Sequence, residues 1–316
     1  MTQRRDRSLP GWRAWEALGF KLAPDCLRLV LDDGQAFRWH GREDGSFVGV
    51  WGSRLVALRS GAGDQVEWTC PGGVSEPAAV RRDLLAYLGC GTDWAAVVDR
   101  LPWRSDAHLA RCVAAFPDLR LLAQPLGETL LCFMCSATKQ IPQIKQMADS
   151  LARTLGEPLP GLGADDLPAE LRALTPKALP TWEAIAHSDE ATLRGCALGF
   201  RAGNILRTAR FLAANPGWLE ESASLPRAQA HERLITLPGV GDKIAECVLL
   251  YSGSHLDAFP VDTWIIQAMA RRYALEGWDP GDVEHFGRVH FGAAAGLAQQ
   301  FIFNFERMQK RAAADS

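Results

Sequence analysis

The stretch LITLPGVGDKIAECV, from Leu234 to Val248, decides the fold of the larger part of this chain. RAQAHERLITL, residues 227–237, has the apolar spacing of an amphipathic helix, and DKIAECVLLY, residues 242–251, has the spacing of a second one. PGVG between them is a turn signal. The pattern predicts a helix, a hairpin and a second helix.

The glycines of this hairpin suit close contact with a phosphate. Side chains at Gly239 and Gly241 would block close approach and forbid unusual φ values, whereas bare amides at a helix N-terminus can point at an anion. Such a turn grips a DNA backbone without reading its sequence. An ordinary turn between two helices explains GVG equally well when that tripeptide is taken alone.

A second segment, FPVDTWIIQAMARR at residues 259–272, favours the functional interpretation. Pro260 stiffens the approach, Asp262 stands where a helix N-cap would, and an apolar helix follows. One helix and one loop separate Asp262 from Lys243, which is enough chain to bring the two side chains together.

Composition excludes several classes of protein. The chain has 316 residues, 47% of them hydrophobic, and no apolar run long enough to span a membrane, so we expect an intracellular protein, cytoplasmic at the nucleoid if bacterial. The net charge of −3 gives no global signature for nucleic acid, so any contact with a polyanion must be local. Cys132 and Cys135 could ligate a metal, but core packing is favoured because no second pair completes a site.

The chain divides into a strand-rich and a helix-rich part. CLRLVLDDG, QAFRWHG, SFVGVWG, RLVALRSG and QVEWTC predict an antiparallel meander between about residues 24 and 72. Helical spacing begins after Pro77, and almost every segment from Pro125 onward is helical. We therefore expect an α+β protein with an antiparallel-sheet domain over residues 12–122 and a helical domain of two subdomains over residues 123–311.

Several motifs carry a resemblance to a known family. LPGVGDKIAEC with FPVDTW resembles the signature of the helix-hairpin-helix-GPD superfamily of DNA glycosylases, and Lys243 groups the chain with the lyase-competent members. DGQAFRWHG, CFMCSATKQIPQI, LRGCALGFRAGNI and FGAAAGLAQQFIF are similar, in the same order, to motifs of the 8-oxoguanine DNA glycosylases. The resemblance covers nearly the whole chain.

The resemblance implies a bifunctional enzyme that flips 8-oxoguanine out of double-stranded DNA and excises it. Lys243 attacks the sugar, a Schiff base forms, and β-elimination cleaves 3′ to the abasic site; Asp262 is the essential carboxylate. The carbonyl of Gly34 senses the N7 hydrogen of the lesion. The remaining base-recognition residues are Gln299 at the base edge and Cys247 and Phe303 at its faces. The chemistry needs no cofactor or metal, and we expect a monomer.

The resemblance also assigns a DNA-binding set and shows where this chain departs from the family. Thr138 replaces an asparagine that fills the space vacated by the flipped base, and Gln143 replaces an arginine that helps select the opposite cytosine, which predicts a relaxed preference for the opposite base. Trp264 replaces a histidine near Asp262, and Phe200 matches the wedge that enters the base stack. The set is Thr138, Lys139, Gln140, Gln143, Phe200, Arg201, Gly239, Val240, Gly241 and Trp264.

Two other interpretations are open at this point. The chain could be a glycosylase of the same fold for another damaged base, which Gly34 and Gln299 argue against. It could also be a non-catalytic DNA-binding module, in which Lys243 has no role. Taken singly, Gly34 is explained by a turn, and Cys247 and Phe303 by a core.

Overall fold

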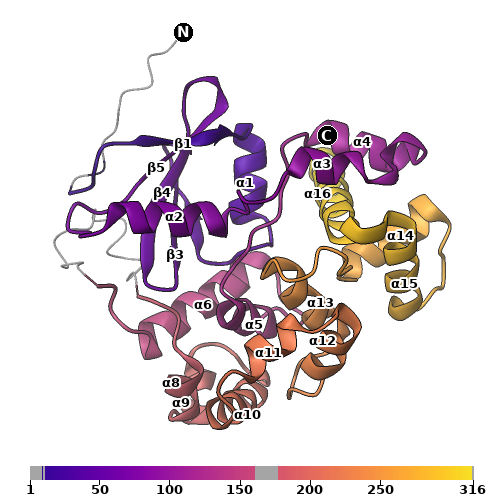
Figure 1. The fold of residues 1–316 in the computed structure, drawn as a ribbon. Helices are drawn as coiled ribbons and strands as arrows, with labels where there is room; N and C mark the ends of the chain where they lie inside the picture. The colour runs from indigo at the N-terminus through magenta and orange to yellow at the C-terminus, as the bar shows by residue number, and fades with distance from the viewer. Residues whose placement is uncertain (1–8, 10, 161–176, 315–316) are drawn as a thin grey trace.

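A computed structural model describes Leu9 and residues 11–160 and 177–314 (Figure 1). One five-stranded antiparallel sheet lies at one side of the molecule, and helices make up the rest, which confirms the predicted α+β class. The strands are β1 (Glu16–Lys21), β2 (Trp39–Gly41), β3 (Phe47–Trp51), β4 (Arg54–Ser60) and β5 (Gln65–Thr69). Their order in the sheet is β1-β5-β4-β3-β2.

Strands β2 to β5 form the predicted meander. Aromatic residues fill the space between this sheet and the helix that follows it: Trp39 and Trp51 stack with ring centroids 6.1 Å apart, and the Trp39 indole donates a hydrogen bond of 2.9 Å to the Tyr87 hydroxyl. Strand β1 was not predicted, because only Leu18 of its six residues is buried and the alternation is therefore weak.

The segment CLRLVLDDG is a helix, so its predicted strand is wrong. It forms α1 (Pro24–Asp32), which begins with proline in its first turn, a position that favours helices. Period-two spacing places Leu27, Leu29 and Leu31 on one face, and this pattern suggested a strand. The helix also buries Cys26 and Val30, which a half-buried strand would leave on its other face together with charged residues.

The helices follow in a nearly unbroken series. Those before the hairpin are α2 (Pro77–Tyr87), α3 (Trp94–Asp99), α4 (Ala107–Ala115), α5 (Leu126–Met134), α6 (Ile141–Leu155), α8 (Trp182–Ala186), α9 (Glu190–Gly195), α10 (Arg201–Ala214), α11 (Trp218–Ser224) and α12 (Arg227–Leu234). After it come α13 (Asp242–Tyr251), α14 (Thr263–Tyr273), α15 (Pro280–Phe291) and α16 (Ala295–Ala314). Short 3-10 turns are η1 (Ala62–Asp64), η2 (Pro102–Arg104) and η4 (Gly292–Ala294).

Helices α3 and α4 lie beside α16 and away from the sheet (Figure 1). Asp106 caps α4 and also accepts hydrogen bonds of 2.9 Å from the Tyr273 hydroxyl and from His290 Nε2. One hydrophobic core continues from Leu18 in the sheet to Phe305 in α16. The expected boundary between two domains after residue 122 stays a proposal. Helix α4 precedes that boundary, yet it packs against α16, the last helix of the chain.

Cys132 and Cys135 are both buried in the core, as expected of packing residues. Within the described ranges, no helix has the length and hydropathy needed to cross a bilayer.

Candidate active site

The predicted hairpin joins α12 to α13, and it is fixed by contacts with α10. Gly239 has a φ of +83°, and a Cβ there would lie 2.7 Å from the side chain of Asn204. Thr208 of α10 donates a hydrogen bond of 3.0 Å to the carbonyl of Pro238. Gly239 therefore needs to be glycine for both conformation and space.

Gly241, the second hairpin glycine, does not have the unusual φ value that was expected of it. Gly241 is the N-cap of α13 with φ −105° and ψ −179°, an extended conformation that any residue adopts. A Cβ there would meet open space, so no contact within the described residues requires glycine at this position. The amide of Val240 already donates to the carbonyl of Leu237, and the Val240 side chain is buried.

Lys243 lies in the first turn of α13, half-buried among groups of low polarity. Its Nζ donates a hydrogen bond of 3.0 Å to the Ser136 hydroxyl and lies 5.3 Å from the centre of the Phe133 ring. Cys247 is one turn further on, and burial raises the pKa of its thiol to about 12. A neutral thiol and an aromatic ring thus surround one side of the amine, while Ser136 orients it.

Asp262 is the N-cap of α14, which confirms the sequence prediction. Its Oδ1 accepts hydrogen bonds from the backbone amides of Trp264, at 3.0 Å, and Ile265, at 2.9 Å. Burial raises the pKa of the carboxyl above its usual value, although these amides and the charges of Lys243 and Arg307 act in the opposite direction. Both bonds end on Oδ1, which leaves Oδ2 for other partners.

Lys243 and Asp262 line the same cavity, of about 770 Å³. Its walls come from the loop before α6, the starts of α13 and α14, one side of α16 and the turn after α1. The predicted residues that line it are Gly34, Thr138, Lys139, Gln140, Lys243, Asp262, Trp264 and Phe303. Segments more than two hundred residues apart in the sequence therefore meet around one space.

Gly34 contacts this cavity with a backbone that only glycine adopts easily. Its φ is +110°, and a Cβ would lie 3.3 Å from Ile141 Cδ1 and 3.6 Å from Phe303 Cε1. The absence of a side chain keeps the Gly34 backbone open to the cavity beside the Phe303 ring.

Cys247 and Gln299 are not in the cavity wall; both lie buried behind it. Gln299 is 4% exposed, and its Nε2 donates a hydrogen bond of 3.1 Å to the carbonyl of Pro260. Its Oε1 is buried and has no hydrogen-bond partner among the described residues. A buried acceptor without a donor is costly, which makes it a candidate for contact with a bound molecule.

Several known proteins are similar to this chain. Residues 18–130 match the family described as 8-oxoguanine DNA glycosylase, N-terminal domain. The chain is 28% identical to the N-glycosylase/DNA lyase OGG1 of Arabidopsis thaliana over 289 residues, 88% of this chain and 76% of that protein. It is 26% identical to the N-glycosylase/DNA lyase of Saccharomyces cerevisiae, over 79% of this chain and 69% of that protein.

A solved structure is similar over nearly its full length. The Clostridium acetobutylicum 8-oxoguanine glycosylase/lyase, in complex with double-stranded DNA containing cytosine opposite 8-oxoguanine, superposes with a TM-score of 0.79 and 28% identity. The match covers 90% of this chain and 92% of that one. The chain is thus similar to 8-oxoguanine DNA glycosylases over most of its length.

Two residues that this family resemblance assigns to the DNA contact differ sharply in exposure. Phe200, at the start of α10, is 65% exposed, an unusual state for a large apolar side chain. Arg201 is 4% exposed; its guanidinium donates to the carbonyls of Ala137 and Leu198 and, at 3.0 Å, to the hydroxyl of Thr138. Phe200 thus projects into solvent with the Arg201 guanidinium carbon 4.4 Å from its ring centroid, whereas Arg201 is occupied within the protein.

The loop before α6 exposes the side chains of Thr138, Lys139 and Gln140 at the cavity. Thr138 has a φ of +56°, rare for a residue other than glycine. The side-chain oxygen of Gln143 accepts a hydrogen bond of 3.1 Å from the Gln140 amide, so it caps α6. Gln143, in the first turn of α6, does not line the cavity.

Ser136, Phe133 and Arg307 contact the site but were not predicted as part of it. Ser136 stands inside the quoted motif CFMCSATKQIPQI, yet nothing in its sequence surroundings indicates that its hydroxyl reaches Lys243. Arg307 lines the cavity one turn after Phe303 on α16, and that spacing was the only available signal.

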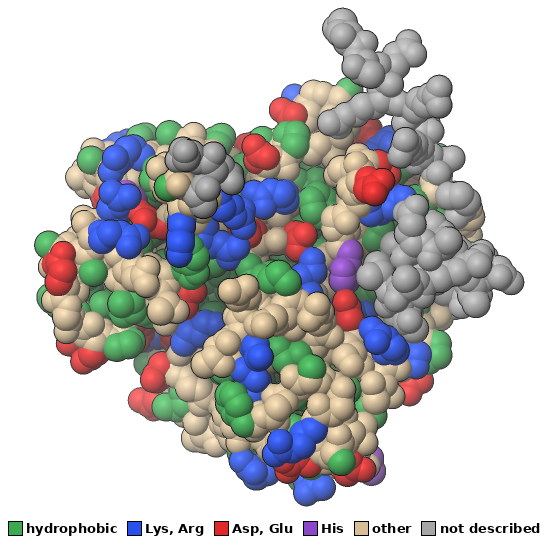
Figure 2. Space-filling view, turned by 180° about the vertical axis from the view of Figure 1, so that it is seen from behind, with side chains coloured by type: hydrophobic (Ala, Val, Ile, Leu, Met, Phe, Trp, Pro, Cys, Tyr) green, Lys and Arg blue, Asp and Glu red, His purple; other side chains and the backbone are tan. Residues whose placement is uncertain are grey.

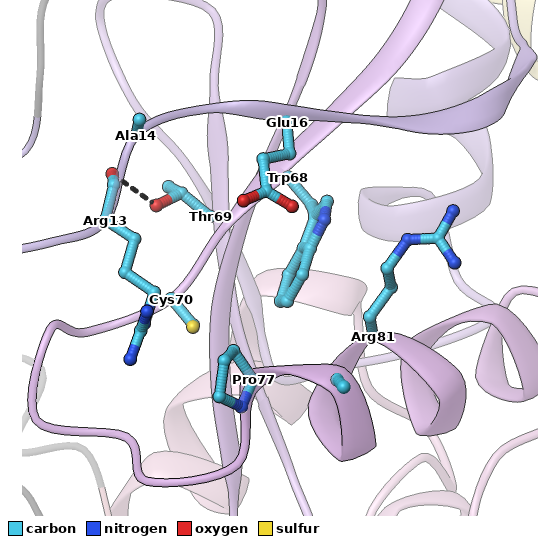
Figure 3. A pocket seen from close by; sticks show the side chains of 9 residues that line it. Arg13, Ala14, Glu16, Trp68, Thr69, Cys70, Pro77 and Arg81 are labelled. Atoms are coloured by element: carbon cyan, nitrogen blue, oxygen red, sulfur yellow. Dashed lines mark hydrogen bonds between the residues drawn. The ribbon is translucent and has the colours of Figure 1, made fainter.

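A second, smaller cavity of about 240 Å³ lies between β1, β5 and the start of α2 (Figure 3). Arg13, Glu16, Trp68 and Arg81 surround it, and neither lysine nor aspartate lines it. Burial raises the pKa of the Cys70 thiol in its wall, which keeps that sulfur protonated and unreactive. A lysine amine thus lines the larger cavity, at Lys243, and none lines this one.

Proposed function

We propose that this N-glycosylase and DNA lyase removes 8-oxoguanine from double-stranded DNA and then cleaves the strand 3′ to the abasic site. The observation that carries the proposal is that Lys243 and Asp262 share one cavity with Gly34 and Phe303. An amine and a carboxylate supply the lyase chemistry, while a bare backbone and an aromatic ring supply a place for a base.

The reaction begins when the damaged nucleotide leaves the base stack and enters the cavity. The Lys243 amine, in its neutral form, bonds to C1′ of the sugar, and the bond from C1′ to the base breaks. The departing base takes up a proton. Opening of the sugar ring gives a Schiff base, loss of a proton from C2′ follows, and the 3′ phosphate leaves by β-elimination.

Asp262 supports this step electrostatically. Positive charge develops on the sugar as the base departs, and a carboxylate fixed by two backbone amides stabilises that charge without having to reorient. The same amides oppose the effect of burial, which raises the pKa of the carboxyl. Capping and catalysis are therefore served by one side chain.

Three features favour 8-oxoguanine as the base. The lesion carries an N7 hydrogen that guanine lacks, and a backbone carbonyl such as that of Gly34 is a suitable acceptor. Phe303 in the cavity wall offers a face for stacking, whereas the uncharged thiol of Cys247 lies buried behind that wall. The unpartnered Oε1 of Gln299 is an acceptor for a donor on the base edge.

Relaxed choice of the opposite base belongs to the same proposal. The Gln143 carboxamide oxygen caps α6, and the Arg201 guanidinium is bound by backbone carbonyls and Thr138. Neither group is then available as a strong bidentate reader of the partner base, a contact worth about 1–3 kcal/mol of discrimination.

Borohydride trapping tests the proposal. Duplexes carrying 8-oxoguanine, uracil, a 3-methyladenine analogue or an abasic site are each incubated with wild-type protein and with Lys243→Gln. We expect trapping with 8-oxoguanine and the abasic site, and none with Lys243→Gln. Trapping with uracil or the 3-methyladenine analogue in place of 8-oxoguanine would indicate another substrate, and failure with every duplex would indicate a non-catalytic module.

A further inference from the structure

Two cationic side chains of α16 lie over the ring of Trp264 at the edge of the cavity. Lys310 Nζ is 4.8 Å from the ring centroid, and the Arg307 guanidinium carbon is 5.9 Å from it. Arg307 also lies 5.0 Å from the centre of the Phe303 ring. Such contacts fix the position of a flexible cation and leave its donors free for another partner.

This edge of the cavity carries an excess of positive charge. Asp33 Oδ1 lies 3.0 Å from both Arg307 and Arg311, so one carboxylate serves two guanidiniums. Among the residues that the structure describes, Lys310 has no carboxylate within ion-pair distance, and it is exposed. Lys and Arg side chains gather in the upper left of Figure 2, the side of the molecule that holds α14 to α16.

At the N-terminus of the neighbouring helix α14, the second and third amides are not available to an anion. The amides of Trp264 and Ile265, which would otherwise point outward, are both bonded to Asp262. A phosphate arriving beside the sugar must therefore be neutralised mainly by side chains. Lys310 is exposed, positioned by Trp264 and close to the lining residue Arg307.

We propose that Lys310, held on the Trp264 ring and backed by Arg307, binds a phosphate of the damaged strand next to the extruded nucleotide. The inference rests on the proposed function, which places that nucleotide in the cavity. Trp264 serves as the platform for the lysine, and Arg307 is a positioning residue that links the platform to Phe303 and Asp33.

Salt-dependent binding provides the test. A duplex with a tetrahydrofuran abasic analogue cannot form a Schiff base, so its affinity reports contacts alone. Each phosphate contact contributes about 0.9 to the slope of log Kobs against log salt concentration. Lys310→Met should therefore weaken the salt dependence and make the slope less negative by about that amount. Arg104→Met is the control, because Arg104 also lies over a tryptophan ring, 4.2 Å from that of Trp103, but outside the cavity. The salt slope of DNA binding by Arg104→Met should equal that of the wild type.

Neutral methylphosphonates locate the contact. Replacement of the contacted phosphate should make wild type and Lys310→Met bind equally, and Trp264→Ala should add little to Lys310→Met because the two act together. An unchanged slope for Lys310→Met, an equal loss for Arg104→Met, or a loss that persists on every methylphosphonate duplex overturns the inference. Borohydride trapping of the wild type on 8-oxoguanine tests the proposed function alone, because it reports the Schiff base and not the phosphate contact of Lys310. Failure of the proposed function can therefore be told apart from failure of the Lys310 inference.

Discussion

Asp262 combines two tasks, and two substitutions separate them. Asparagine is as good an N-cap as aspartate, but it carries no charge, whereas alanine loses both the cap and the charge. The structure defines the cap completely, because Oδ1 accepts from the amides of Trp264 and Ile265 at 3.0 and 2.9 Å. We expect Asp262→Asn to keep the fold and lose the reaction.

The expected magnitudes differ enough to be measured. Loss of the cap in Asp262→Ala should lower the free energy of unfolding by about 0.5–2 kcal/mol, while Asp262→Asn should change it little. Removal of one preoriented electrostatic group lowers the rate of the chemical step by about 10²–10³-fold. Both variants should show that loss of rate, but only Asp262→Asn should keep the stability of the wild type.

The pH dependence of stability gives an independent check. Burial raises the pKa of Asp262 in the folded state, so the folded protein binds this proton more tightly than the unfolded chain. The wild type should therefore lose stability relative to Asp262→Asn as pH rises from the usual carboxyl pKa to the raised one. Above that window the difference should be constant. A difference that grows in favour of wild type would contradict the raised pKa.

Single-turnover excision of 8-oxoguanine at saturating protein, with urea unfolding of the same samples, measures both quantities. If Asp262→Asn excises the base at the wild-type rate while Asp262→Ala is slow only in proportion to its lost stability, Asp262 is a helix cap and nothing more. That result would refute the electrostatic role.

Three further predictions concern the base and its partner. Gly34→Ala forces a side chain to a φ of +110° and to 3.3 Å from Ile141, so it should cost about 1–3 kcal/mol of stability and lower the ratio of kcat/KM for 8-oxoguanine over guanine; denaturation and competitive excision measure these, and an unchanged ratio would remove Gly34 from recognition. Gln299→Leu eliminates a buried Oε1 that has no partner among the described residues, so the free protein should be no less stable while excision falls, and full activity would show that Gln299 only fills the core. Excision opposite each of the four bases should vary less than the discrimination of about 1–3 kcal/mol given by a bidentate contact, which a strong preference for cytosine would contradict.

Local signals made the hairpin and the Asp262 cap predictable. A helix N-cap needs one oxygen near two amides of its own chain, so FPVDTW was sufficient. The helix α1 was predicted as a strand because Leu27, Leu29 and Leu31 have the period-two spacing of a strand, whereas the neighbouring core also buries Cys26 and Val30.

Tertiary contacts could not be predicted in the same way. Ser136 and Lys243 are 107 positions apart, and their hydrogen bond depends on how α5 packs against α13. Cys247 and Gln299 were expected at the base, yet both are buried behind the cavity wall, since side-chain burial depends on neighbours that a motif does not specify. Arg201 was assigned to DNA, but its guanidinium donates to the nearby carbonyl of Leu198 and to that of Ala137, 64 positions away.

The identity of the lysine that forms the Schiff base is the most direct test of the account. Wild-type protein is reduced with borohydride on a duplex carrying 8-oxoguanine, digested, and analysed by mass spectrometry for the peptide that bears the sugar. The account predicts the adduct on Lys243. An adduct on another lysine, such as Lys139 in the same cavity wall, or base release without any adduct, would contradict it.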